Sequence, residues 1–116
     1  MYLCTEMNEH EHLSIEQAQQ AVDRWIRSTG KGYFAPLTNA VILAEETGEV
    51  AAVMARLFGD QVAKEGDCLN LADELADVLW VVMAIANQTG IDLSEAFRAN
   101  LLKKSTRDAH RHDIDK

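Results

Sequence analysis

The stretch that decides the fold spans residues 71–90 and reads LADELADVLWVVMAIANQTG. It is an apolar segment whose acidic residues are confined to its beginning. Glu74 and Asp77 are three positions apart, so in a helix both project from one face. Between Leu75 and Ala86 polar residues are nearly absent apart from Asp77, which makes a solvent-facing role for this carboxylate hard to assign.

A second acidic cluster lies within residues 41–54, which read VILAEETGEVAAVM. Glu46 and Glu49 repeat the three-residue spacing, and Glu45 adjoins them. Carboxylates on a face that should be buried lose hydration and repel one another unless a cation neutralises them. One such cluster alone is typical of a solvated helix face. Two of them on neighbouring apolar helices favour a shared site for a divalent cation.

Helix signals divide the chain into four predicted helices, and no segment alternates in the manner of a strand. Pro36 is expected just before the second helix. The expected helices run from Ser14 to about Arg27, from Thr38 or Asn39 to Phe58, from Asn70 to about Thr89, and from Asp92 to about Lys104. The pattern predicts an all-α bundle in which the second and third helices pack antiparallel and bring their acidic clusters to similar height.

At 116 residues the chain is expected to form one domain. Residues 1–13 are expected to be a flexible arm, residues 14–106 the helical domain and residues 107–116 a charged tail. Apolar residues make up 47% and charged residues 26%, which is typical of a globular protein. The net charge of −8, without a basic stripe, argues against a nucleic-acid polymer as partner.

The sequence also predicts a cytoplasmic protein without a membrane segment. Residues 1–12 lack the basic and apolar regions of a signal peptide. The longest apolar run, residues 78–86, is too short to cross a bilayer. Cys4 and Cys68 belong to no CxxC pair and are read as reduced thiols.

The choice of metal follows from the ligand types. A di-iron bundle requires a Glu-x-x-His on its helices, and zinc prefers His or Cys ligands. The chain's histidines all lie in the terminal arms, at His10, His12, His110 and His112. Oxygen ligands alone favour the hard cations Mg²⁺, Mn²⁺ or Ca²⁺. Of these Mg²⁺ is expected, with Mn²⁺ as a substitute, because their retained waters and affinity for phosphate suit phosphoryl chemistry.

Together the two acidic clusters resemble the signature of the MazG-like all-α nucleoside triphosphate pyrophosphohydrolases, in particular their small single-domain members. The resemblance extends to residues 34–37 (FAPL), 75–80 (LADVLW) and 86–93 (ANQTGIDL). It covers roughly residues 15–107. It implies a four-helix MazG-like bundle that assembles as a homodimer or as a tetramer built from dimers.

The resemblance also implies an activity, the hydrolysis of a nucleoside triphosphate to the monophosphate and pyrophosphate. The family's metal ligands correspond to Glu46, Glu49, Glu74 and Asp77. Glu45 joins the catalytic group as a carboxylate that supports these ligands, orients the attacking water or is simply solvated. House-cleaning of non-standard nucleotides and control of deoxynucleotide pools are both open as biological purposes.

Four aromatic residues are candidates for contact with the nucleotide base, namely Trp25, Tyr33, Phe34 and Trp80. Core packing is the alternative for each of them, as it is for most aromatic residues at helical spacing. For Asn39 and Asn87, capping or a hydrogen bond between helices is favoured over a contact with the base or sugar.

The last predicted helix carries the candidates for phosphate contact. Lys103, Lys104 and Arg107 are expected to neutralise the departing pyrophosphate, or else to interact with the helix C-terminus. Small relatives often place a Lys and, four residues later, an Asn in this helix. Here the order is exchanged, with Asn100 preceding Lys104.

Three other functions remain open from the residues themselves. The same fold and metal site can serve another phosphoanhydride, such as a phosphoribosyl-linked nucleotide. A regulatory module can hold a nucleotide or Mg²⁺ without turnover. A structural helical bundle needs only that the acidic runs face solvent.

Overall fold

The computed structural model describes residues 11–66 and 69–114, with side chains as far as residue 107. It contains the helices α2 (Ile15–Ser28), α3 (Pro36–Phe58), α4 (Leu71–Gln88) and α5 (Leu93–Ile114). Within those residues there is no strand, and the predicted all-α class is confirmed. The expectations for Cys4, Cys68 and His10, and for most of the N-terminal arm, lie outside the described residues.

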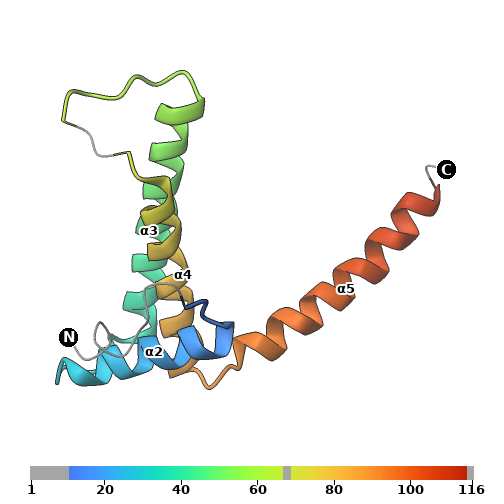
Figure 1. Ribbon diagram of the computed structural model, residues 1–116, viewed down its shortest axis with the longest axis horizontal. Coiled ribbons are helices and arrows are strands. Elements are labelled where there is room, and N and C mark those ends of the chain that lie inside the picture. The colour runs from blue at the N-terminus through green and yellow to red at the C-terminus, as the bar shows by residue number, and fades with distance from the viewer. Residues whose placement is uncertain (1–10, 67–68, 115–116) are drawn as a thin grey trace.

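Helices α3 and α4 stand side by side as an antiparallel pair, and α2 crosses the foot of this pair (Figure 1). The fourth helix, α5, packs against α2 and then runs away from the other three helices (Figure 1). The predicted pairing of the two acidic helices is therefore present. The described chain does not close into a compact four-helix bundle by itself.

The expected helix starts are confirmed where a polar side chain caps the first turn. Ser14 and Gln17 form a reciprocal capping box at α2, with the Gln17 N–H donating to Ser14 Oγ at 3.1 Å. The Asn70 side chain accepts the N–H of Asp73 at 3.1 Å and begins α4. Asp92 accepts the N–H of Glu95 at 3.2 Å before α5.

Two expected boundaries are wrong. Pro36 is the first residue of α3 and does not precede the helix, because its missing N–H would find no partner there and its φ is already helical. Helix α5 continues past Lys104 to Ile114. No Gly or Pro follows Gly90, so the sequence holds no residue that stops this helix early.

The buried core is small and lies where α2 crosses α4. Val22 and Ile26 of α2 pack with Met83 and Ala84 of α4, and Tyr33 covers them from the connection to α3. Burying an aliphatic side chain of this kind contributes about 1.5–3 kcal/mol. This core fixes the direction of α2, and Leu93, the first residue of α5, packs against its edge.

Large apolar side chains remain exposed on several helices. On α3, Leu37 is 83% exposed and Phe58 is 74% exposed, and α5 exposes Phe97 and Leu102. Apolar patches of this extent commonly mark surfaces that another molecule covers. As to membranes, none of the described helices combines the length and the apolar composition needed to span one.

A hydrogen-bonded pair of amides joins the start of α3 to the end of α4. Asn39 is buried, and its Nδ2 donates to Gln88 Oε1 at 2.8 Å. The Gln88 Nε2 in turn donates to the carbonyl of Phe34 at 2.9 Å. Nearby, Asn87 Nδ2 donates to the carbonyl of Gln19 at 2.9 Å. The preference for interhelical hydrogen bonds at Asn39 and Asn87 is confirmed.

We expect Asn39→Ala to lower the free energy of unfolding by about 1–3 kcal/mol, because it leaves the Gln88 amide oxygen without its donor. Urea denaturation followed by circular dichroism measures this change. The Asn39→Ala/Gln88→Ala double variant should lose less than the sum of the two single variants. Strict additivity would show that the hydrogen bond contributes nothing to stability.

Candidate metal centre

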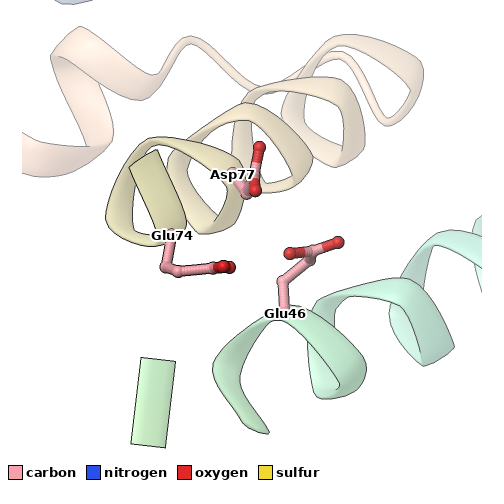
Figure 2. Close-up of side chains that lie close together, drawn as sticks. All are labelled: Glu46, Glu74 and Asp77. Carbon is pink, nitrogen blue, oxygen red and sulfur yellow. The ribbon is translucent and has the colours of Figure 1, made fainter. Parts of the chain in front are cut away.

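Three carboxylates meet between α3 and α4. Glu46 projects from α3, and Glu74 and Asp77 project toward it from α4 (Figure 2). One carboxylate oxygen of each residue lies within 4.8 Å of the other two. Glu46 and Glu74 are half-buried. The arrangement offers three oxygen ligands to one point from two helices that pack directly against each other.

These residues occupy the packing seam of the helix pair. Along α4 the three- and four-residue spacing that starts at Glu74 and Asp77 continues through the buried Val81 and Ala84 to Gln88. Along α3 the same spacing gives Asn39, Ile42, Glu46, Glu49 and Val53. Positions with this repeat face the partner helix. The carboxylates therefore point at each other because they replace apolar residues at seam positions.

Burial and mutual repulsion raise the pKa of two of the carboxyls. Burial raises the pKa of Glu46, and the charges of Asp77 and Glu49 raise it further. The pKa of Glu74 is raised by the same burial and by the charges of Asp77, Glu49 and Glu46. Both groups thus hold their protons more tightly in the folded chain than in the unfolded chain. A bound cation would reverse this preference.

The other two predicted carboxylates lie at the rim. Glu49 is exposed and is not part of the close group, but its charge acts on both Glu46 and Glu74. Glu45 is also exposed, and its charge acts on Glu46. The structure therefore brings together three of the four predicted metal ligands. The ligand role of Glu49 and the catalytic role of Glu45 remain predictions.

The sequence reasoning missed Asp73. Asp73 is not among the candidate site residues of the sequence analysis, yet its charge raises the pKa of both Glu46 and Glu74. The signal was present, because Asp73 lies four positions before Asp77 and hence on nearly the same face of α4. The cluster thus holds more negative charge than the predicted ligands alone.

An apolar groove lies between α2 and α4. Trp25 of α2 and Trp80 of α4 meet edge to face, with ring centroids 5.6 Å apart and an interplanar angle of 86°. They line a groove of about 320 Å³ between the two helices. Its other lining residues are all apolar and are Leu13, Ala18, Ala21, Val22, Ala76, Leu79 and Met83. Ala76 and Trp80 belong to the same two helical turns as Glu74 and Asp77.

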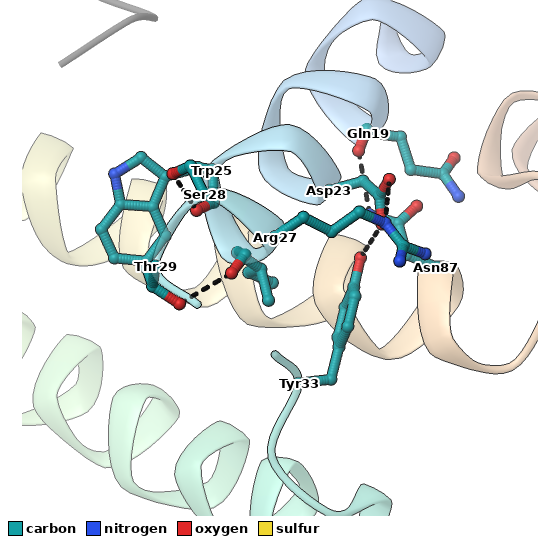
Figure 3. A network of polar contacts seen from close by, with 9 residues as sticks. Gln19, Asp23, Trp25, Arg27, Ser28, Thr29, Tyr33 and Asn87 are labelled. Carbon is teal, nitrogen blue, oxygen red and sulfur yellow. Dashed lines mark hydrogen bonds and ion pairs between the residues drawn. The ribbon is translucent and has the colours of Figure 1, made fainter. Parts of the chain in front are cut away.

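The other two aromatic candidates lie elsewhere. The Tyr33 hydroxyl donates a hydrogen bond to Asp23, which also pairs with Arg27 at 2.9 Å (Figure 3). The Tyr33 hydrogen bond holds the pKa of Asp23 below its ordinary value. Phe34 follows in the connection to α3 and is 64% exposed. The structure gives Tyr33 a packing role, and contact of either residue with the substrate stays a prediction.

The predicted phosphate-binding residues are not at the carboxylates of their own chain. Asn100, Lys103, Lys104 and Arg107 are exposed on α5. Helix α5 packs on α2 and runs away from α3 and α4, so its C-terminal half lies far from the carboxylate cluster of its own chain (Figure 1).

A larger hollow of about 620 Å³ lies near the other end of α4, beside the turn that leads into α5. Both charged and amide side chains line it, including Glu16, Asp23, Arg24 and Asn87. It contains none of the carboxylates of the metal centre. Some of its lining residues already bond to one another, since Asn87 Nδ2 donates to the Gln19 carbonyl and Arg27 pairs with Asp23.

Comparison with known proteins identifies the family. Residues 34–112 match the model of the MazG nucleotide pyrophosphohydrolase domain, which is more than half of the chain. This chain is a MazG nucleotide pyrophosphohydrolase family member. The match includes both acidic helices and nearly all of α5, and it confirms the resemblance read from the acidic clusters.

Relatives of this MazG chain agree in sequence and in fold. The uncharacterized protein YpjD of Bacillus subtilis (strain 168) is 35% identical over 99 residues, which are 84% of this chain and 89% of YpjD. The crystal structure of YpjD matches with a TM-score of 0.72 at 33% identity, covering 80% of this chain and 96% of that one.

A second solved structure is that of the Bacillus-conserved MazG protein, a nucleotide pyrophosphohydrolase. It matches with a TM-score of 0.69 at 32% identity and covers 80% of this chain and 90% of that one. The predicted MazG-like fold is therefore confirmed. Membership also makes the chain an enzyme of the nucleotide pyrophosphohydrolase class.

The electrostatics of the cluster predict how the metal-free MazG chain responds to pH. Because the pKa of Glu46 is raised above its ordinary 4.5 in the folded state, the unfolded chain binds fewer protons as the carboxyls titrate. The free energy of unfolding should therefore fall as pH rises from about 4.5 through the raised pKa values of Glu46 and Glu74. Below that range Glu46 and Glu74 are protonated in both the folded and the unfolded chain, so they no longer lower the free energy of unfolding.

Glu46→Gln should accordingly raise the thermal unfolding midpoint of the metal-free protein at pH 7, and the gain should vanish toward pH 4. Scanning calorimetry in the presence of a chelator measures it. Glu16→Gln removes the same charge at the start of α2, where a negative charge is favourable, and should lower the midpoint slightly. A lower midpoint for Glu46→Gln would show that the carboxylates do not oppose folding.

Proposed function

We propose that the chain hydrolyses a nucleoside triphosphate, in the presence of Mg²⁺, to the monophosphate and pyrophosphate. The observation that supports this most is the close group of Glu46, Glu74 and Asp77 between two packed helices. Family membership supplies the reaction class. The identity of the metal and of the nucleotide are the parts that the proposal adds.

The donor set fits a hard dication. The close group offers carboxylate oxygens only, which suit Mg²⁺ or Mn²⁺ and disfavour softer metals. Burial first, and then the neighbouring negative charges, raise the pKa values of Glu46 and Glu74, and a bound cation would offset both effects. Mg²⁺ in proteins commonly takes few carboxylates and completes its shell with water and phosphate oxygens. Glu45 and Glu49 at the rim of the site are exposed, so water and phosphate oxygens have room to approach a cation there.

In this mechanism the side chains mainly hold the metal ion and orient the reacting groups. Glu46, Glu74 and Asp77 would hold Mg²⁺, with Glu49 and Asp73 adding negative charge from either side. When bound, Mg²⁺ neutralises polyphosphate oxygens and makes a water more acidic. Positioning and charge stabilisation account for most catalysis of phosphoryl transfer, so this plain set of residues suffices.

The attacking nucleophile is proposed to be water. No Ser–His or Cys–His pair is among the interactions of the described residues, and hydrolysis needs none. Glu45 is exposed beside Glu46 and would orient this water or accept its proton. The oxygen of water then bonds to the α-phosphorus, and the bond to the bridging oxygen breaks as pyrophosphate leaves.

The base is proposed to enter the groove between Trp25 and Trp80. Its apolar lining suits the faces of a nucleobase, and two of its lining residues, Ala76 and Trp80, come from the turns of α4 that also carry Glu74 and Asp77. Stacking on an aromatic ring is available to every base. With only apolar side chains in the lining, recognition would depend on shape and stacking more than on hydrogen bonds.

Self-association is part of the proposal. The exposed apolar side chains of α3 and α5, such as Phe58 and Leu102, are what a homodimer or a tetramer of dimers would cover. Size-exclusion chromatography with light scattering at several concentrations measures the assembly.

The deciding experiment is a substrate panel. Pyrophosphate release from each standard and deoxynucleoside triphosphate is measured with Mg²⁺, with Mn²⁺ and with a chelator, and the nucleotide product is identified. The proposal expects monophosphate and pyrophosphate only when a divalent cation is present. Metal-dependent thermal stabilisation without release from any nucleotide would instead favour a binding module and overturn the hydrolase assignment.

We expect Asp77→Asn to lower the rate of pyrophosphate release at least about 100-fold, because it removes a charge from the proposed ligand group. Glu49→Gln should have a comparable effect if its predicted ligand role is correct. Circular dichroism should show that both variants keep their helices. Wild-type turnover by Asp77→Asn would exclude this site.

We expect Trp80→Leu to raise KM about 5- to 100-fold while changing kcat less, since it removes base stacking and keeps an apolar lining. Quenching of the remaining tryptophan fluorescence by added nucleotide provides an independent binding measurement. Phe97→Leu serves as the matched aromatic control, because Phe97 lies on α5 outside the groove and is not a candidate for base contact. Equal KM values for Trp80→Leu and the wild type would place the base elsewhere.

A further inference from the structure

We propose that the N-terminal tip of this chain, residues 1–4 (MYLC), binds in the apolar groove between α2 and α4 and competes there with the nucleobase. The competition rests on the proposed function, because it assumes that the base enters this groove. The binding of the tip does not depend on it. The arm as a whole is expected to be flexible, and the proposal gives its apolar end a place to bind.

The first step is the exposed apolar surface of the groove. All of its lining side chains are apolar, yet Trp25 is 45% exposed and Leu79 is 53% exposed. Apolar side chains gathered in one hollow commonly mark a surface that another apolar group covers. The groove therefore favours an apolar occupant over a charged one.

The second step is the point at which the arm joins the groove. Leu13 precedes the helix cap Ser14 and is itself one of the lining residues, as is Ala18 in the first turns of α2. These are the two positions of a hydrophobic staple, which fixes the angle at which a chain enters a helix. The arm thus meets α2 at the edge of the groove, and its last residue already belongs to the lining.

The third step is the distribution of apolar residues along the arm. Residues 1–4 are all apolar, whereas residues 5–12 read TEMNEHEH and contain a single apolar residue, Met7. The arm is therefore an apolar tip on a polar tether of eight residues.

The length of this tether is sufficient for the tip to return to the groove. Eight extended residues reach up to about 26–29 Å. The groove runs along α2 from Ala18 to Trp25, and seven residues of helix are about 10 Å long. The tip can therefore lie over any part of the groove.

The fourth step is local concentration, which selects the chain's own tip as the occupant. A short flexible tether keeps a group near its site at an effective concentration on the order of millimolar. Even weak binding then fills the groove while no nucleotide is present. A nucleotide whose phosphates are held at the carboxylates would displace the tip, so the tip would raise the nucleotide concentration needed for turnover.

The first test reads the cover of the groove through its tryptophans. Trp25 and Trp80 are the two tryptophans of the chain, and both line the groove. We expect Tyr2→Ser/Leu3→Ser to shift their emission to longer wavelength and to raise the acrylamide quenching constant, because loss of the apolar tip uncovers the rings.

The matched control for this test is Thr5→Ser/Asn8→Ser, which changes two residues of the tether, keeps the tip and should leave the fluorescence unchanged. The capping box of α2 is intact in both variants, and circular dichroism should show unchanged helix content. An unchanged quenching constant in the tip variant would overturn the proposal.

The second test asks whether the tip lies in the groove of its own chain. In a background with Cys68→Ser, Ala76→Cys adds a thiol to the groove lining, and Cys4 belongs to the tip. A disulfide within one chain is expected in an oxidising glutathione buffer and is identified by peptide mapping. Ala44→Cys, at an exposed position of α3 outside the groove, is the control and should give much less. A covalent dimer in place of the bond within one chain would assign the tip to a second copy and overturn the proposal, as would the absence of any disulfide.

The third test concerns the competition with the base. If the tip fills the groove in one half to nine tenths of the molecules, Tyr2→Ser/Leu3→Ser should lower KM about 2- to 10-fold while kcat is unchanged. An unchanged KM would overturn the competition. Inactivity of the wild type toward every nucleotide, with the quenching change and the disulfide both present, would refute the proposed function and leave the binding of the tip standing.

Discussion

The main constraint on this structure is the repulsion between carboxylates that face each other across the α3–α4 seam. Glu46, Glu74 and Asp77 stand at positions where a helix pair normally places apolar side chains. Burial and the neighbouring charges both raise the pKa values of the two glutamates, so the charged state is disfavoured here. The helix pair must therefore be held together by contacts elsewhere along the seam. Under the proposed function, a cation would bind to carboxylates that these contacts have already brought together.

Those contacts flank the cluster on both helices. The Asn39–Gln88 hydrogen bond fixes one end of the seam, and Asn39 lies seven residues, two turns, before Glu46 on the same face of α3. Val81 and Ala84 pack between this bond and the carboxylates, and Val53 is buried on the other side. A slip of one helix past the other would break the amide pair and separate Glu46 from its partners. Seam packing is thus what positions the site.

The sequence predicted most of this arrangement because its determinants are local. Ser14, Asn70 and Asp92 cap their helices as expected, and the three-residue spacing of the carboxylates requires only that both segments be helical. The start of α3 was wrong because Pro36 serves as a first helical residue as well as a breaker. The direction of α5 could not be predicted from local sequence. The turn before α5 is held by hydrogen bonds that join Ile91 and Leu93 to Gln19 of α2, which lies 72 and 74 residues earlier in the chain.

The absence of basic residues from α4 has a physical reason within this scheme. A lysine at a seam position would pair with the carboxylates, relieve their repulsion and stabilise the metal-free chain. It would also compete with a dication for the same oxygens. The one basic residue of α3, Arg56, instead bonds a backbone carbonyl of its own helix. Under the proposed function, keeping cations off the seam lowers stability and leaves the carboxylates available to a metal, which is the compromise expected where function opposes folding. The basic residues are concentrated elsewhere, and six of the 11 follow Phe97 in the sequence.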